Sequence, residues 1–138
     1  MKLVSYKTED REHLGLFIDG HIYNLNSCDK LLPDNMNEFL QGGEVLMERA
    51  KKVDLQIKDG SFSAKEEIFY EILAPVPHPT SCRDGYAFRQ HVAAARRNRK
   101  VDMIPQFDDY PIFYFTNNNA IQGTGEKECM HDYFEKLN

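Results

Sequence analysis

Three prolines at alternate positions, Pro75, Pro77 and Pro79, constrain the fold of this chain more than any other feature. Proline holds φ at about −65° and has no backbone N–H, so this stretch must run extended and cannot supply donors to a sheet. We therefore expect a domain boundary near residue 75. It separates a β-rich amino-terminal domain over residues 1–75 from a linker and the beginning of an incomplete second domain over residues 76–138.

The composition is that of a soluble globular protein. Of the 138 residues, 41% are hydrophobic and 28% are charged, and the chain is long enough to bury a core. The net charge of −5 argues against a nucleic-acid partner. We see no signal peptide and no apolar run of about 18 residues, so we expect a cytoplasmic protein that does not bind membranes. Cys28, Cys82 and Cys129 have no metal-type spacing and are predicted to be free thiols.

Local patterns predict an α+β fold for the first domain. Residues 14–25 alternate like two strands around Asp19-Gly20, which is a strong signal for a β-hairpin. Residues 35–53 show the apolar period of a short helix followed, after Gly42-Gly43, by a second helix. Further strands are expected over residues 2–6 and 68–73. Together these elements predict a small, strongly bent, barrel-like β-sheet with short helices.

The second domain is predicted to begin with a helix over residues 84–99. Ser81 or Asp84 can cap this helix, and the run Ala93-Ala94-Ala95 strengthens the prediction because alanine is the best helix former. A strand of the buried type is expected over residues 111–116, and a loop over residues 122–126.

Asp84 and His91 are the candidate functional pair on this helix. At about 100° and 1.5 Å per residue, they return to nearly the same helix face, separated by roughly 10 Å along the axis. Phe88 and Ala95 fall on the same stripe, so an apolar wall carries a possible metal ligand at one end and a possible general base at the other. Two structural alternatives stay open: Asp84 as a helix cap, and His91 as a partly buried histidine.

A basic cluster, Arg96-Arg97-Asn98-Arg99-Lys100, follows at the end of the predicted helix. Cations near a helix carboxyl terminus interact favourably with the helix dipole, which explains the cluster without any function. The alternative is an anchor for an anionic group of a substrate. Cys82, beside Asp84, is interpreted as a small structural residue, because no neighbouring pattern supports a catalytic thiol.

An ordered series of motifs runs through nearly the whole chain and resembles the amino-terminal part of a fumarylacetoacetate hydrolase family protein. The stretch from Asp84 to His91 is the most specific of them. The series consists of Met1-Lys2-Leu3-Val4-Ser5-Tyr6, Leu32-Pro33 with Met36 and Phe39-Leu40, Ala74-Pro75-Val76-Pro77-His78-Pro79, Arg83-Asp84-Gly85-Tyr86-Ala87-Phe88-Arg89-Gln90-His91-Val92, Met103-Ile104-Pro105, Pro111-Ile112-Phe113-Tyr114-Phe115-Thr116-Asn117 and Ala120-Ile121-Gln122-Gly123.

The resemblance implies the first strands of a β-roll catalytic domain and an enzyme that hydrolyses a carbon–carbon bond. The substrate is a diketo acid, fumarylacetoacetate or acylpyruvate-like, and a divalent cation, Mg²⁺ or Ca²⁺, polarises its diketo group. By resemblance, Asp84 is a ligand of the cation and His91 is the general base. Tyr86, Arg99 and Lys100 are the expected substrate-binding residues. The expected assembly is a homodimer.

The family's other cation ligands, a Glu-x-Glu pair followed by an Asp, are not matched at the expected place. Glu126 and Glu128 have the right spacing but come too early, and Asp132 lies in what resembles the lead-in to the ligand-bearing strand. We therefore expect an amino-terminal fragment that is inactive by itself. Two alternatives stay open. One is a non-catalytic assembly or regulatory module of the same fold, and the other is a related keto-acid decarboxylase, isomerase or hydratase.

Overall fold

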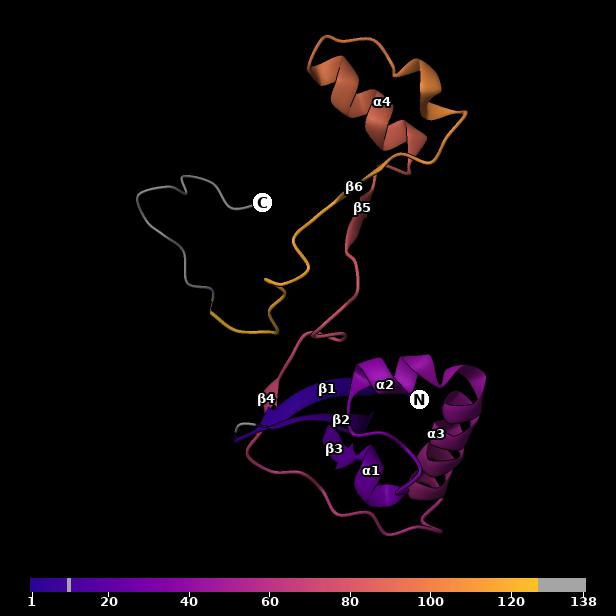
Figure 1. Ribbon diagram of the computed structural model, residues 1–138, viewed down its shortest axis with the longest axis vertical. Coiled ribbons are helices and arrows are strands. Elements are labelled where there is room, and N and C mark those ends of the chain that lie inside the picture. Colours follow the sequence, from indigo (N-terminus) through magenta and orange to yellow (C-terminus); the bar gives the residue numbers. More distant parts are fainter. Residues whose placement is uncertain (10, 127–138) are drawn as a thin grey trace. The chain divides into compact units, whose positions relative to one another are not determined.

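The computed structural model describes residues 1–9 and 11–126 and divides the chain into two compact units (Figure 1). The first unit comprises Met1–Pro77 together with the segment that starts at Gln122, and the second comprises His78–Ile121. The division after Pro77 lies two residues beyond the boundary predicted from the prolines. The described elements are a small antiparallel sheet and short helices, which confirms the α+β class.

The first unit is built on an antiparallel sheet with the strand order β3-β2-β1-β4. The predicted hairpin is confirmed, because Asp19 and Gly20 connect β2 to β3 with positive φ angles of 51° and 92°. Such angles suit the tight turns that match the twist of two paired strands. The four strands are β1 (Leu3–Thr8), β2 (Arg11–Ile18), β3 (His21–Asn24) and β4 (Glu71–Ile72).

The predicted strand over residues 68–73 is wrong in its extent. β4 covers only Glu71–Ile72, which pair with Lys7 and Tyr6 of β1. Phe69 adopts a left-handed backbone with φ of 59° and is 91% exposed, which interrupts the extended path before β4. The apolar run therefore belongs mostly to a surface segment.

Residues Gln122–Glu126 form the predicted loop but belong to the first unit, whereas the sequence placed them in the second domain. Gly123 lies against the backbone at the end of β4. A Cβ atom at this position would collide with the carbonyl oxygen of Ile72 and the backbone of Leu73. The close approach explains why a glycine is needed there.

Three helices complete the first unit, and both helices predicted within residues 35–53 are confirmed. Asn35 caps the first of these two, since its side chain accepts a hydrogen bond of 2.9 Å from the backbone N–H of Glu38. None of the helices in residues 1–9 and 11–126 has the length and hydropathy needed to cross a membrane. The three helices are α1 (Leu25–Cys28), α2 (Met36–Gln41) and α3 (Gly43–Lys58).

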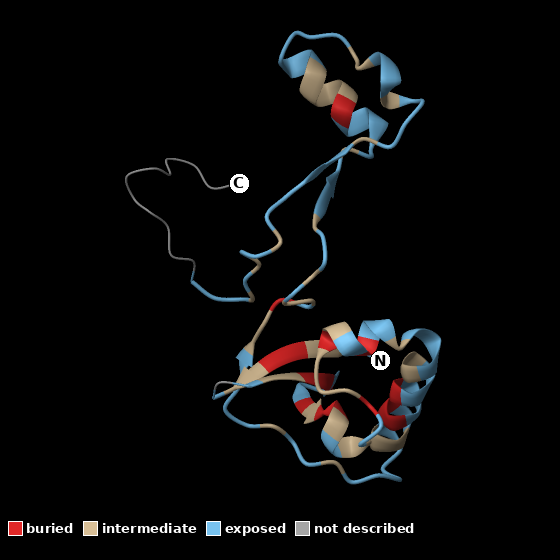
Figure 2. Ribbon diagram, viewed as in Figure 1, coloured by how far each residue is buried: buried red, intermediate tan, exposed pale blue. Residues whose placement is uncertain are grey.

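The core of the first unit lies between the sheet and these helices (Figure 2). Alternate residues of β2 point inward, and the helices contribute the opposite wall. The core residues are Leu14, Leu16, Ile18, Leu25, Leu32, Met36, Phe39, Ala50 and Val53.

A polar network ties the loop before α2 to the hairpin. The carboxylate of Asp34 lies 2.9 Å from Nδ1 of His13, whose Nε2 lies 3.0 Å from Oγ1 of Thr8. Nδ2 of Asn24 donates both to Asp34 (3.1 Å) and to the hydroxyl of the buried Tyr6 (2.9 Å). Burial raises the pKa of Tyr6 well above its usual value, so this hydroxyl stays protonated and available to the network.

The second unit contains the helix α4 (Arg89–Asn98), the 3₁₀ turn η1 (Pro105–Phe107) and the two-stranded ribbon of β5 (Arg83–Gly85) and β6 (Phe113–Phe115). The predicted helix start at residue 84 is wrong. Asp84 lies on β5, and Phe88 occupies the position before the first helical residue without a side-chain cap. The pairing of β5 with β6 holds residues 83–85 extended, so the helix begins only after the ribbon.

The predicted strand near residues 111–116 is confirmed as the shorter β6, but its predicted burial is wrong. Phe113, Tyr114 and Phe115 are 41%, 61% and 65% exposed. The continuous apolar run suggested a strand covered on both faces, whereas the described part of the second unit buries a single hydrophobic residue, Val92 of α4. The described part of the second unit therefore consists of a ribbon, a helix and loops with little buried apolar surface between them.

We predict that the buried face of β2 dominates the stability of the first unit. Replacing the fully buried Leu16 with Ala should lower the free energy of unfolding by about 2–5 kcal/mol, because it removes buried methyl groups and leaves a cavity. The matched change in Leu55, which is 63% exposed on α3, should cost less than about 0.5 kcal/mol. Urea unfolding followed by circular dichroism measures both. Equal losses for the two variants would contradict this core.

Candidate functional site

The ribbon in the second unit positions Asp84. Asp84 lies directly opposite Tyr114 in the antiparallel pair, and Gly85 lies opposite Phe113. Two further backbone hydrogen bonds extend the pairing at both ends, from Tyr86 N to Ile112 O (2.9 Å) and from Thr116 N to Cys82 O (3.0 Å). The short β5 is thus held over most of its length by a strand that comes later in the chain.

A cavity of about 490 Å³ opens between this ribbon and α4. Cavities of this size hold small-molecule ligands, and the mixture of aromatic walls with a few charged groups is typical of such sites. The lining residues come from β5, the segment after it, α4 and β6. They are Asp84, Gly85, Tyr86, Ala87, Phe88, His91, Ala95, Arg96, Arg99, Ile112, Phe113 and Tyr114.

The structure brings most of the predicted site residues to this cavity. Asp84, Tyr86, His91 and Arg99 all line it, whereas Lys100 is not among the lining residues. The reasoning that placed Asp84 and His91 together was wrong, however. Asp84 reaches the cavity from β5 and His91 from α4, so their proximity comes from the fold of the ribbon and not from a shared helix face.

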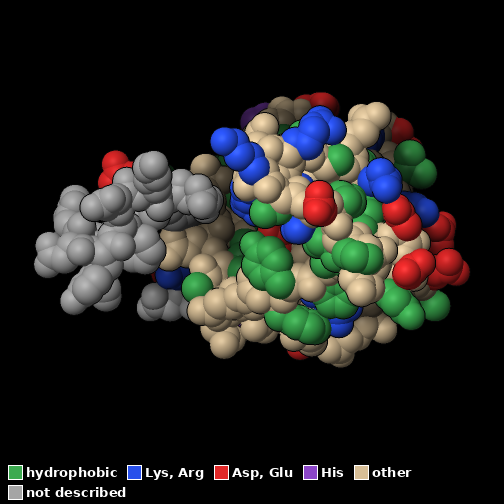
Figure 3. Space-filling model, turned by 90° about the horizontal axis from the view of Figure 1, so that it is seen from above, with side chains coloured by type: hydrophobic (Ala, Val, Ile, Leu, Met, Phe, Trp, Pro, Cys, Tyr) green, Lys and Arg blue, Asp and Glu red, His purple; other side chains and the backbone are tan. Residues whose placement is uncertain are grey.

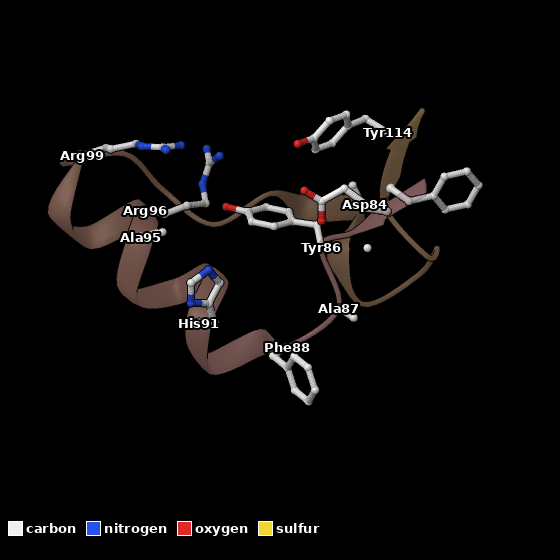
Figure 4. A pocket seen from close by; sticks show the side chains of 12 residues that line it. Asp84, Tyr86, Ala87, Phe88, His91, Ala95, Arg96, Arg99 and Tyr114 are labelled. Atoms are coloured by element: carbon white, nitrogen blue, oxygen red, sulfur yellow. The ribbon is translucent and has the colours of Figure 1, made fainter. Parts of the chain in front are cut away.

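The charged groups are distributed unevenly around the cavity (Figure 4). The guanidinium groups of Arg96 and Arg99 lie at one end, and the hydroxyl of Tyr86 points toward Arg96. Asp84 lies toward the opposite end, beside Tyr114. Two fixed positive charges therefore face one carboxylate, which suits a ligand that carries an anionic group.

His91 and Phe88 both lie at the start of α4, and the side chains of both are exposed. His91 is an exposed residue in the first turn of α4, so it is accessible to a ligand and is not the partly buried structural histidine of the alternative interpretation. Phe88, expected to share an apolar wall with His91, is 80% exposed, and its ring points away from the arginines (Figure 4). Phe88 still lines the cavity, and Tyr86, Ala95 and Ile112 are among the other residues of its apolar wall.

The loop after α4 holds the helix in place beside the ribbon. Nε and Nη2 of Arg89 donate to the two carboxylate oxygens of Asp108 at 2.8 and 3.0 Å, a two-pronged contact that fixes orientation as well as distance. Nε of Arg96 donates to the carbonyl oxygen of Asp102. The ring of Phe107 meets that of Tyr86 edge to face at 6.2 Å.

The two faces of the β5–β6 ribbon carry different side chains. The contact between the hydroxyl of Tyr114 and the carboxylate of Asp84, together with the negative charge of that carboxylate, raises the pKa of Tyr114. The guanidinium of Arg83 lies 5.1 Å from the ring centres of both Phe113 and Phe115. Alternation along the strands thus gives one face with Asp84 and Tyr114 and another with Arg83 and the phenylalanines.

Sequence reasoning missed Tyr114 as a site residue, and it left the choice within the basic cluster open. The alternation within Phe113-Tyr114-Phe115 could have separated the tyrosine from its neighbours, because adjacent residues of a strand point to opposite faces. For the basic cluster, Arg96 and Arg99 lie three residues apart, which is close to one helical turn and places both toward the cavity.

The described residues do not complete a divalent-cation site. Residues 1–9 and 11–126 contain no group of three or more His, Cys, Asp or Glu side chains that could hold a metal ion. Asp84 is the single carboxylate among the residues that line the cavity, and Glu126 belongs to the first unit. Glu128 and Asp132 lie outside the described residues. Because Mg²⁺ and Ca²⁺ need about six or more oxygen ligands, the fit of such a cation to the described residues is poor.

No protein-family model and no curated protein matches this chain in sequence.

We predict that Arg89 controls the charge state of Asp108. Hydrogen bonds from Arg89 hold the pKa of the Asp108 carboxyl below its usual range, so Arg89→Gln should return that pKa upward to the ordinary aspartate value. A depressed pKa means that the pair contributes stability above the ordinary pKa of aspartate and loses it as the pH falls through the lowered pKa. NMR titration of the Asp108 carboxyl carbon measures the shift.

The matched control is Arg97→Gln, which removes an exposed guanidinium from the same helix. This variant should leave the titration of Asp108 unchanged. A titration curve of Asp108 that is the same in Arg89→Gln and in the wild type would show that the ion pair does not hold α4 to the loop.

Proposed function

We propose that this chain is the amino-terminal part of a fumarylacetoacetate hydrolase-type enzyme that hydrolyses a carbon–carbon bond in a diketo acid. The observation that carries the proposal is the shared cavity, which gathers Asp84, Tyr86, His91 and Arg99 from separate elements. These are the positions that the ordered motifs implied for a cation ligand, a general base and substrate binding. On this proposal the second unit is the start of a β-roll catalytic domain.

The charge distribution supports an acidic substrate. Arg96 and Arg99 lie at one end of the cavity, beside the hydroxyl of Tyr86 (Figure 4). A guanidinium presents several N–H donors in one plane, which matches the two oxygens of a carboxylate. The substrate carboxylate therefore binds at this end, and its carbonyl groups extend toward His91 and Asp84. Lys100, which the motifs also implied, does not take part in this proposal.

His91 acts as the general base in this scheme. The unprotonated nitrogen of a neutral imidazole can take a proton from a water molecule that attacks the carbonyl carbon of the bond to be cleaved. The exposed position of His91 on α4 gives water access to the ring. The arginines keep the acid oriented while the proton moves.

Asp84 would supply one oxygen ligand to the Mg²⁺ or Ca²⁺ that the motifs imply. A cation of this kind polarises a diketo group when it is bound. The described residues do not complete its coordination, so we derive no step through it.

We predict that His91 and Asp84 have separable roles in a longer version of the protein that supplies the missing carboxylates. His91→Ala should lower the rate of acylpyruvate hydrolysis by about 100- to 10,000-fold, the usual contribution of a general base, while the affinity for Mg²⁺ stays within about twofold. Asp84→Ala should instead weaken Mg²⁺ binding itself. Turnover assays and calorimetric titration with Mg²⁺ measure the two effects.

His21→Ala is the matched control, because His21 is an exposed histidine of the first unit paired with Glu66 at 3.0 Å. It should leave turnover unchanged. Unchanged turnover in His91→Ala would remove the general base from the proposal. Decarboxylation of oxaloacetate without acylpyruvate hydrolysis would favour the decarboxylase alternative, and ligand binding without turnover of any keto acid would favour a non-catalytic module.

We also propose that the chain associates with itself as a homodimer, and we predict that exposed aromatic side chains of β6 contribute. Phe113 and Phe115 are 41% and 65% exposed, and hydrophobic side chains also reach the surface drawn in Figure 3, among Lys and Arg. Apolar surface of this kind favours association. Phe115→Ser should therefore reduce the dimer fraction in light scattering, whereas Leu31→Ser, at a 68% exposed site of the first unit, should not. A wild-type chain that stays monomeric at high concentration would contradict the prediction.

A further inference from the structure

We propose that Tyr114 is a positioning residue that holds the carboxylate of Asp84 in place at the cavity. What this positioning does for the protein rests on the function proposed above for Asp84. The geometry that places Tyr114 opposite Asp84 is independent of that function. Both residues line the cavity, and they lie directly opposite each other on β5 and β6.

The register of the ribbon places the two side chains on one face. Residues directly opposite each other in an antiparallel pair have Cβ atoms about 4.5–5.5 Å apart and interact as a cross-strand pair. The carboxylate of Asp84 raises the pKa of the Tyr114 hydroxyl, so the two groups interact, and we infer that this hydroxyl donates a hydrogen bond to the carboxylate. Figure 4 shows the hydroxyl end of Tyr114 and the carboxylate of Asp84 beside each other at the edge of the cavity.

Asp84 needs such a partner because its own strand gives its side chain little support. Asp84 is exposed, and the glycine that follows it offers no side chain to pack against. The neighbouring polar groups on the ribbon are engaged elsewhere. Arg83 lies against Phe113 and Phe115 on the other face, and the hydroxyl of Tyr86 points toward Arg96. Tyr114 is therefore the residue placed to restrict the rotation of the Asp84 side chain.

The hydrogen bond leaves Asp84 able to bind a ligand. An ionised carboxylate has about four acceptor positions on its two oxygens, and a phenol hydroxyl uses one of them. The remaining positions stay available to a cation or to a polar group of a substrate.

The test compares the rotamer of Asp84 in the wild-type 138-residue chain and in Tyr114→Phe, using the NMR couplings between its α and β protons. A single rotamer in the wild type and averaged couplings in Tyr114→Phe are the expected results. The matched control is Tyr110→Phe, which removes the hydroxyl of a tyrosine that is similarly exposed, at 67% against 61%, and does not line the cavity. This control should keep the single rotamer.

A third variant separates positioning from simple support of the ribbon. Incorporating 4-aminophenylalanine at position 114 restores an N–H donor at nearly the same place, so it should restore the single rotamer. Contacts between the α protons of Arg83 and Phe115, a non-hydrogen-bonded pair of the ribbon, report whether the strands stay paired in each variant. If Tyr114→Phe loses the pairing of β5 with β6, the 4-aminophenylalanine variant becomes the deciding measurement. A variant that recovers this pairing without the single rotamer of Asp84 overturns the proposal.

Two other outcomes also overturn it: averaged couplings of Asp84 in the wild type, or a single rotamer in Tyr114→Phe with the ribbon intact. None of these readouts requires a cation or turnover, so a failure of the proposed hydrolase function leaves the test valid.

Discussion

The candidate site depends on the pairing of β5 with β6. Because Arg83–Gly85 are held extended by Phe113–Phe115, Asp84 lies on a strand and faces the cavity beside Tyr114. The same pairing turns the chain between these strands into a closed loop that contains α4 and η1. Without the ribbon, nothing in the described second unit would hold the carboxylate of Asp84 near the imidazole of His91.

The two units are stabilised by different forces. The first buries a continuous apolar core under its sheet, which is the dominant favourable contribution to folding in most domains. The second relies on a short ladder, on Arg89 paired with Asp108, and on ring contacts such as that of Tyr86 with Phe107. Exposed ion pairs contribute little free energy, so these contacts select an arrangement more than they stabilise it.

This arrangement has a chemical consequence for the cavity. Its cationic end, formed by Arg96 and Arg99, lies on α4, whereas its carboxylate lies on β5. A ligand that spans the cavity must therefore interact with the arginines of the helix and with Asp84 of the ribbon at the same time. A change in the distance between helix and ribbon would alter both interactions. The interactions that orient α4 and Asp84 consequently matter to the site although they do not touch a ligand themselves.

Local features of the sequence determined much of the first unit, because each depends on neighbouring residues. Asp19-Gly20 specifies a hairpin through its own backbone preferences, and the apolar period within residues 35–53 specifies two helices. Asp84, Tyr86 and His91, which the motif singled out within one stretch of the chain, line one cavity. The conformation of this stretch, however, could not be predicted from its own residues. Whether Asp84 extends the helix or pairs with Tyr114 is decided by a strand far along the chain, and no local pattern reports such pairing. The exposure of that strand, the orientation of Phe88 and the position of Tyr114 opposite Asp84 were likewise decided only by the tertiary structure, because each depends on how another element is placed.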